Sequence, residues 1–101
     1  MPTLKGTITW VSDTRTTQSK KDGSALLITT IEVETLCYRE DGSTYAQHEL
    51  FDCFGYDRHQ LVAASEQRTQ YSFSITRDTR THDGRHYASN RCFAINAVGD
   101  A

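Results

Sequence analysis

The aromatic side chains of this chain, interspersed with lysines and arginines, are the groups whose types could engage a ligand. One tryptophan, five tyrosines and four phenylalanines occur among the 101 residues. Proteins that hold single-stranded nucleic acids stack bases on aromatic rings, and each stacked base contributes about 1–3 kcal/mol. The core of so small a domain cannot absorb every ring, so several are expected at the surface. The alternative for each tyrosine is a rim residue whose hydroxyl group faces water.

Positive charge gathers in the last third of the chain and in a polar stretch near its beginning. The candidate phosphate-binding residues are Lys5, Lys20, Lys21, Arg77, Arg80, Arg85 and Arg91. Because the formal net charge of the whole chain is −2, nucleic-acid binding has to depend on local rather than overall charge. The alternative for the arginines is an exposed hairpin in which Asp78 and Asp83 pair with them.

Residues that could support catalysis or hold a metal ion lack a productive spacing. The histidines are His48, His59, His82 and His86. Only His82 and His86 have the His-x-x-x-His spacing, and these two flank a turn, where histidines are usually polar turn residues. No Cys-x-x-Cys and no glycine-rich phosphate loop occurs. Glu32 and Glu34 share a strand face near Glu49 and could bind a divalent cation, with a solvated acidic patch as the alternative. We therefore expect no enzymatic activity, no metal ion and no cofactor.

Length and composition predict a single domain spanning residues 1–101. Hydrophobic residues make up 37% and charged residues 24% of the chain, values typical of a soluble globular protein. No apolar run approaches the roughly 18 residues of a membrane helix, and the first residues lack a secretory signal pattern. Cys37, Cys53 and Cys92 are odd in number and widely spaced, so we expect free thiols rather than a disulfide framework. These features predict a cytoplasmic protein with no membrane partner.

Alternating apolar and polar residues predict five strands, and one further segment predicts a short helix. The expected strands span residues 4–11, 25–38, 44–54, 70–79 and 86–98, and the expected helix spans residues 56–66, capped by Asp57. Residues 13–24 carry no aliphatic side chain and are expected to form a loop. This loop is either a solvated hairpin tip or a ligand contact.

The faces of the first and third strands can be assigned from alternation. Phe51 and Cys53 fall on one face of the third strand, which we assign to the core. The other face carries His48, Leu50, Asp52 and Phe54. In the first strand, the residues that share one face are Leu4, Gly6, Ile8 and Trp10. Gly6 indicates a bulge or a sharp coil, as small barrels require.

The last two strands are joined at an Asp-Gly dipeptide. A three-residue loop with Gly84 in the left-handed conformation would place Phe73 opposite Phe93 and Tyr71 opposite Ile95. This register gathers the apolar residues on one face, so we prefer it to the two-residue alternative. The aromatic part of the core is therefore predicted to comprise Phe51, Tyr71, Phe73 and Phe93.

The order of the elements predicts the fold. Five strands with one short helix between the third and fourth are the arrangement of the OB-fold, an all-β, five-stranded Greek-key barrel. The alternative is a small open-faced sheet with one helix packed across it.

Several short motifs occur in the order found in bacterial single-stranded DNA-binding (SSB) proteins. They are Leu4-x-Gly6-x-Ile8, Ile31-Glu32-Val33-Glu34-Thr35, Leu50-Phe51-Asp52-Cys53-Phe54-Gly55, Tyr71-Ser72-Phe73 and Asp83-Gly84-Arg85-x-Tyr87. The chain therefore resembles the SSB-like OB-fold family over residues 4–98.

This resemblance implies roles for particular residues. In the SSB family, the Phe of a Phe-Gly strand end and an aromatic residue ending the second strand stack on bases, which assigns Phe54 and Tyr38 to stacking. His48 falls where the family usually has tryptophan, and Trp10 is a further stacking candidate. Asp52, on the same predicted face, would repel phosphate. Related proteins bury the edge of the first strand against another subunit, which implies a homo-oligomer, either a dimer or a tetramer.

The sequence thus predicts a non-enzymatic OB-fold protein that binds single-stranded DNA with little sequence preference and supports DNA replication, recombination or repair. One alternative is an OB-fold subunit whose main partner is a protein of a larger assembly, which the net negative charge, Asp52 and His48 favour. The other alternative is RNA binding by the same face.

Overall fold

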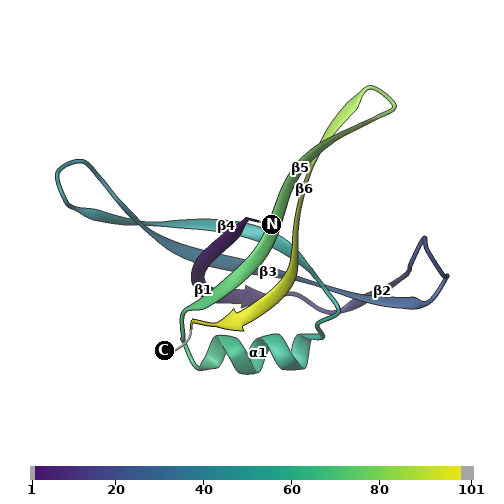
Figure 1. Cartoon of the computed structure of the whole chain (residues 1–101), viewed down its shortest axis with the longest axis horizontal. Coiled ribbons are helices and arrows are strands. Elements are labelled where there is room, and N and C mark those ends of the chain that lie inside the picture. Colours follow the sequence, from purple (N-terminus) through teal and green to yellow (C-terminus); the bar gives the residue numbers. More distant parts are fainter. Residues whose placement is uncertain (1, 99–101) are drawn as a thin grey trace.

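Strands make up most of the computed structural model, which describes residues 2–98 except for the side chains of residues 80, 82 and 87 (Figure 1). The elements are β1 (Thr3–Val11), β2 (Arg15–Gln18), β3 (Ala25–Tyr38), β4 (Thr44–Phe54), α1 (Arg58–Glu66), β5 (Tyr71–His82) and β6 (Arg85–Ala97). The predicted all-β class and the single short helix before the last two strands are confirmed. Three hairpins project outward from the body, and α1 lies across one end of it.

The strands form one six-stranded sheet in the order β1-β5-β6-β4-β3-β2, and β1 also pairs with β3. Residues 3–6 of β1 pair with β5, whereas residues 7–11 pair with β3. Strand pairing therefore runs from β1 through β3, β4, β6 and β5 and back to β1. All of these pairings are antiparallel except the short parallel contact between β4 and β6.

The prediction that residues 13–24 form only a loop is wrong, because this stretch contains β2. Arg15 to Gln18 pair antiparallel with Ile28 to Ala25 at the beginning of β3. Thr16 and Thr17 favour the extended conformation, and the edge of β3 offers them unpaired backbone groups. Backbone hydrogen bonds to β3 therefore stabilise an extended conformation in this segment, although its polar composition favours a loop.

The helix begins at the predicted cap. The Asp57 side chain accepts a hydrogen bond from the Gln60 backbone N–H at 2.9 Å, and the Gln60 side chain accepts one from the Asp57 backbone at 3.1 Å. This reciprocal capping box satisfies two helix-end donors, and it sets the first helical residue at Arg58. Leu61 is the buried residue of the helix and anchors it against the sheet.

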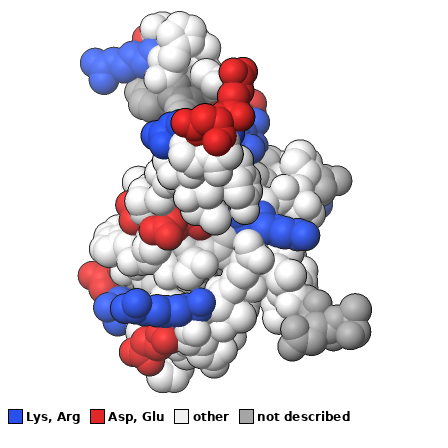
Figure 2. All heavy atoms as spheres, turned by 90° about the vertical axis from the view of Figure 1, so that its left-hand side faces the viewer, with Lys and Arg blue, Asp and Glu red and all other residues white. Residues whose placement is uncertain are grey.

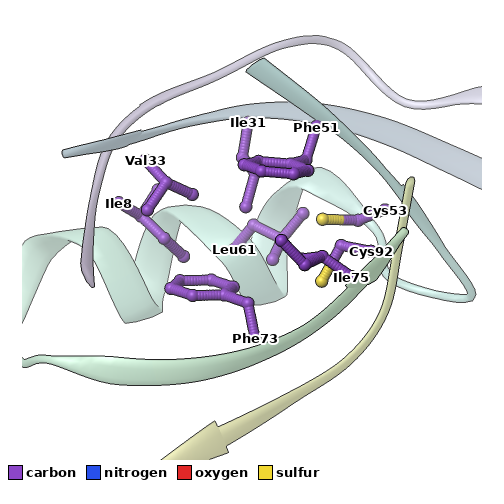
Figure 3. Packing of buried hydrophobic residues seen from close by; sticks show 9 residues of the cluster. All are labelled: Ile8, Ile31, Val33, Phe51, Cys53, Leu61, Phe73, Ile75 and Cys92. Atoms are coloured by element: carbon purple, nitrogen blue, oxygen red, sulfur yellow. The ribbon is translucent and has the colours of Figure 1, made fainter. Parts of the chain in front are cut away.

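The core lies between the curved sheet and α1 (Figure 3). Its buried side chains are Ile8, Ile31, Val33, Phe51, Cys53, Leu61, Phe73, Ile75 and Cys92. The predicted inward direction of Phe51, Cys53 and Phe73 is confirmed, and Tyr71 packs partly buried against this cluster. Full burial of such apolar side chains stabilises the fold by about 1.5–3 kcal/mol each.

The register of the last hairpin differs from the prediction. The loop has two residues, Asp83 and Gly84, with φ angles of 52° and 75°. Positive φ at both central residues is the conformation that an Asp-Gly hairpin turn favours. The preferred three-residue loop is therefore wrong, and Phe73 lies opposite Ile95 rather than Phe93.

Phe93 points away from the core and lies at a β-bulge in β6. Ser74 pairs with Ala94 and Ile75 pairs with Cys92, which leaves Phe93 as the extra residue. Phe93 is consequently 42% exposed, so its assignment to the core is wrong. A bulge of this kind re-aims one side chain without ending the strand.

A second β-bulge, in β1, turns Trp10 outward. Ile8 pairs with Val33 and Trp10 pairs with Glu32, which leaves Thr9 as the extra residue. Gly6 and Ile8 are buried, whereas Trp10 is 50% exposed. The expectation that Trp10 shares their face is wrong, because the extra residue reverses the alternation.

The three cysteines are free thiols in different surroundings. Cys53 and Cys92 oppose each other on β4 and β6 and are fully buried, whereas Cys37 is partly exposed. A hydrogen bond with the Cys92 thiol, together with burial, raises the pKa of Cys53.

Iodoacetamide added to the native protein at mildly alkaline pH should therefore modify Cys37 well before the other two cysteines. Access favours Cys37, and the raised pKa keeps the buried Cys53 in its unreactive thiol form. Peptide mapping by mass spectrometry over time measures the order, and the guanidinium-unfolded protein, in which all three should react, is the control. Equal native rates for Cys37 and Cys53 would contradict the packing of β4 against β6.

Candidate nucleic-acid interface

A groove of about 420 Å³ lies where β2 and the beginning of β3 face the end of β4 and the middle of β6. Its lining residues are Thr17, Gln18, Ser19, Lys20, Leu26, Phe54, Arg91 and Phe93. Three residues predicted for nucleic-acid binding, Lys20, Phe54 and Arg91, thus meet in one place although they are far apart in sequence. The groove combines ring surface, cationic side chains and small polar groups.

Two stacked phenylalanine rings form one wall of this groove. The ring centroids of Phe54 and Phe93 are 5.6 Å apart, and their planes differ by 13°. Phe54 is the last residue of β4, and the bulge in β6 brings Phe93 beside it. The Arg91 guanidinium carbon lies 6.0 Å from the centre of the Phe54 ring. We call Phe54 and Phe93 the phenylalanine platform.

Asp52 lies beside the platform and is engaged by its neighbours. Its Oδ1 accepts a hydrogen bond from Thr30 Oγ1 at 2.7 Å and lies 3.3 Å from Arg15 Nη2. Asp52 also lies opposite Arg91 in the parallel register between β4 and β6. The carboxylate expected to repel phosphate is therefore paired with Arg15, which offsets part of its charge.

The other predicted stacking residues lie outside the groove. Tyr38 is 73% exposed at the far end of β3, roughly 33 Å along the strand from Ile28, the partner of Phe54. His48 Nε2 lies 3.0 Å from Glu34 Oε2, and Trp10 lies opposite Glu32. The structure thus brings neither Tyr38, His48 nor Trp10 together with Phe54.

Arg77 is occupied by an ion pair. Its Nε and Nη2 donate hydrogen bonds to Glu49 at 2.6 and 2.8 Å, and these bonds raise the pKa of Arg77. Asn90 also donates to Glu49 at 3.3 Å. The arrangement links β5, β4 and β6, and it engages the guanidinium group that was predicted to bind phosphate. Glu49 is paired with Arg77, so it is not positioned to share a divalent cation with Glu32 and Glu34.

The remaining predicted cations are dispersed. Lys5 on β1, Lys21 in the turn after β2 and Arg85 at the β5–β6 turn are exposed. Arg80 belongs to β5, and its side chain lies outside the described part of the structure. Figure 2 shows Lys and Arg interspersed with Asp and Glu on the visible face rather than gathered in one basic area. Of this group, only Lys21 adjoins a groove residue, Lys20.

Phe93 is the site residue that the sequence interpretation missed. A signal for it was present, because the Asp-Gly dipeptide favours a two-residue turn. Counting back from that turn pairs Ile75 with Cys92 and turns Phe93 outward beside the end of β4. The three-residue loop, which gathers all apolar residues on one face, instead predicts that Phe93 faces the core.

A second cavity of about 480 Å³ lies between the middle of β1, Glu34 and the end of α1. Its lining includes Glu66 and Arg68 and contains no aromatic ring. Among the side chains that the structure describes, no three His, Cys, Asp or Glu residues gather to hold a metal ion. None of the described helices has the length and apolar character needed to cross a membrane.

Comparison with known proteins leaves the site to be interpreted from its geometry. The chain matches no protein-family model, and no curated protein is significantly similar to it.

Proposed function

We propose that this chain is an OB-fold domain that binds single-stranded DNA with little sequence preference. The closed order of pairings through β1, β3, β4, β6 and β5, with β4 parallel to β6, supports a five-stranded Greek-key barrel. The position of α1 between β4 and β5 supports the same assignment. Support for DNA replication, recombination or repair follows from this activity as part of the proposal.

The observation that carries the binding proposal is the phenylalanine platform beside Arg91 and Lys20. Ring faces hold bases of any sequence, because every base has a flat π surface, and the two cations can meet the phosphates between bases. The groove is open and shallow enough to take a strand rather than an enclosed small molecule. Lys20 and Arg91 line the same groove as the rings, so both can contribute charge beside a stacked base.

β1 supports the proposed homo-oligomer. Each half of this strand pairs with a different neighbour, β5 or β3, so each half keeps one edge outside these pairings. Unpaired strand edges favour pairing with another chain. A second copy aligned along β1 would form a symmetric contact of the kind common in dimers.

Fluorescence anisotropy of fluorescein-labelled oligo-dT, measured over a series of salt concentrations, tests the function. We expect saturable binding at low salt and a slope of log K against log salt of about −2, because Lys20, Lys21 and Arg91 would release about three counterions. Unlabelled oligo-rU, added as a competitor, distinguishes DNA from RNA preference. Absence of binding at low salt, or a slope near zero, would exclude the proposal.

A further inference from the structure

The outer side of β1, β3 and β4 combines exposed apolar side chains with carboxylates. Trp10, Leu50 and Leu36 are 50%, 53% and 58% exposed. Single exposed apolar residues are common, whereas a group of them on one face marks an interaction site. Glu32 and Glu34 lie among them on β3.

The register of the sheet places these five residues on one continuous surface. Trp10 lies opposite Glu32, and Glu32 lies opposite Leu50, so the three form a row across β1, β3 and β4. Glu34 and Leu36 follow on the same face of β3 at two-residue intervals. Directly opposed side chains lie about 5 Å apart, which makes the row continuous. We call these five residues the acidic–apolar face.

The charge of this face is negative. Glu32 Oε1 accepts a hydrogen bond from Thr9 at 2.8 Å, and Glu34 Oε2 lies 3.0 Å from His48. No Lys or Arg in the described part of the chain forms an ion pair with either glutamate. Arg15, on the neighbouring strand β2, pairs with Asp52.

We propose that the acidic–apolar face docks a protein segment in which apolar side chains alternate with lysine or arginine. The apolar side chains of the segment would cover Trp10, Leu50 and Leu36, and its cations would meet Glu32 and Glu34. Charge complementarity selects this occupant, because opposite potentials guide association whereas a phosphate backbone would be repelled. The face shares no residue with the lining of the groove.

Trp10 provides the readout, because it is the only tryptophan of the chain and lies within the face. The probe is a synthetic peptide of alternating lysine and leucine, without tryptophan. We expect saturable binding with a blue shift of Trp10 emission as leucine side chains replace water around the indole ring. Peptides that alternate lysine with serine, or glutamate with leucine, should produce no such shift.

Two variants locate the contact. Glu32→Gln/Glu34→Gln should weaken binding of the lysine–leucine peptide about fivefold at low salt, whereas Asp13→Asn/Glu40→Gln, which changes net charge equally elsewhere, should leave it unchanged. Leu50→Ser should weaken it about tenfold through lost apolar contact. Far-ultraviolet circular dichroism checks that each variant is folded. Failure of the peptide to bind, or equal weakening by the Asp13/Glu40 control, would overturn the proposal.

Oligo-dT anisotropy with the same variants separates this proposal from the proposed function. Substitutions at Glu32 and Glu34 should leave oligo-dT bound at least as tightly, because they remove negative charge outside the groove. Loss of oligo-dT binding together with peptide binding would show that the face and the groove are one site, which overturns the docking proposal alone.

Discussion

Replacing both Phe54 and Phe93 with alanine should lower the affinity for oligo-dT about 10- to 100-fold, the range expected when a base loses its stacking surface. The two rings stack on each other with centroids 5.6 Å apart, so they act as one platform. Each single substitution should therefore cause most of the loss, and the double substitution should add less than the sum. Anisotropy titrations of the four proteins, compared as a double-mutant cycle, measure this coupling.

Tyr38→Ala is the matched control for the platform. It removes an exposed aromatic ring that the SSB resemblance assigned to stacking but that lies at the other end of β3. We expect this variant to keep the affinity of the unaltered protein. If Tyr38→Ala weakens binding as strongly as Phe93→Ala, the strand follows the outer face of β3 and the groove is not the main site.

The elements formed by local alternation could be predicted from the sequence. The limits of β3 and β4 match the expected segments, because both strands alternate along their length and an Asp-Gly turn separates them. The Asp57 cap was equally local, since its partner Gln60 lies three residues away. In each case the interacting groups are close in sequence, so their types and spacing carry the information.

The inward position of Ile95 and the outward position of Trp10 could not be predicted by alternation alone. A single extra residue in each strand reverses which face the following side chains take. Whether a bulge forms depends on the neighbouring strands, because Thr9 is extra only relative to β3 and Phe93 only relative to β5. The same limit applies to β2, whose four polar residues become a strand only against the edge of β3.

The electrostatic surroundings of Asp52 also depend on the tertiary structure. Thr30 and Arg15, which contact its carboxylate, come from different strands. From the sequence, Asp52 was an argument against phosphate binding on that face. In the folded chain Asp52 pairs with Arg15 beside the groove. Among the described residues, no Lys or Arg pairs with Glu32 or Glu34, so their negative charge is not offset in this way.

Gly6→Ala should lower the free energy of unfolding by about 1–3 kcal/mol, the usual effect of overfilling a well-packed interior. A Cβ atom at position 6 would lie 2.6 Å from Val33 Cγ1 and 2.7 Å from the Glu34 carbonyl oxygen. β1 changes partners at this point, because Gly6 pairs with Tyr71 and Thr7 pairs with Glu34. Urea unfolding followed by circular dichroism measures the loss.

Val33→Ala in the Gly6→Ala background separates the two close contacts. Removing the Val33 methyl groups relieves one of them, but the Glu34 carbonyl belongs to the backbone and cannot withdraw without disturbing the pairing of Thr7. We therefore expect Gly6→Ala to lower the free energy of unfolding in the Val33→Ala background as well, so the double variant should be less stable than Val33→Ala alone. A double variant as stable as Val33→Ala alone would show that only side-chain crowding excludes a methyl group at position 6. An unchanged stability of Gly6→Ala would mean that β1 does not approach β3 this closely, and the closed order of strand pairings would then lose its main support.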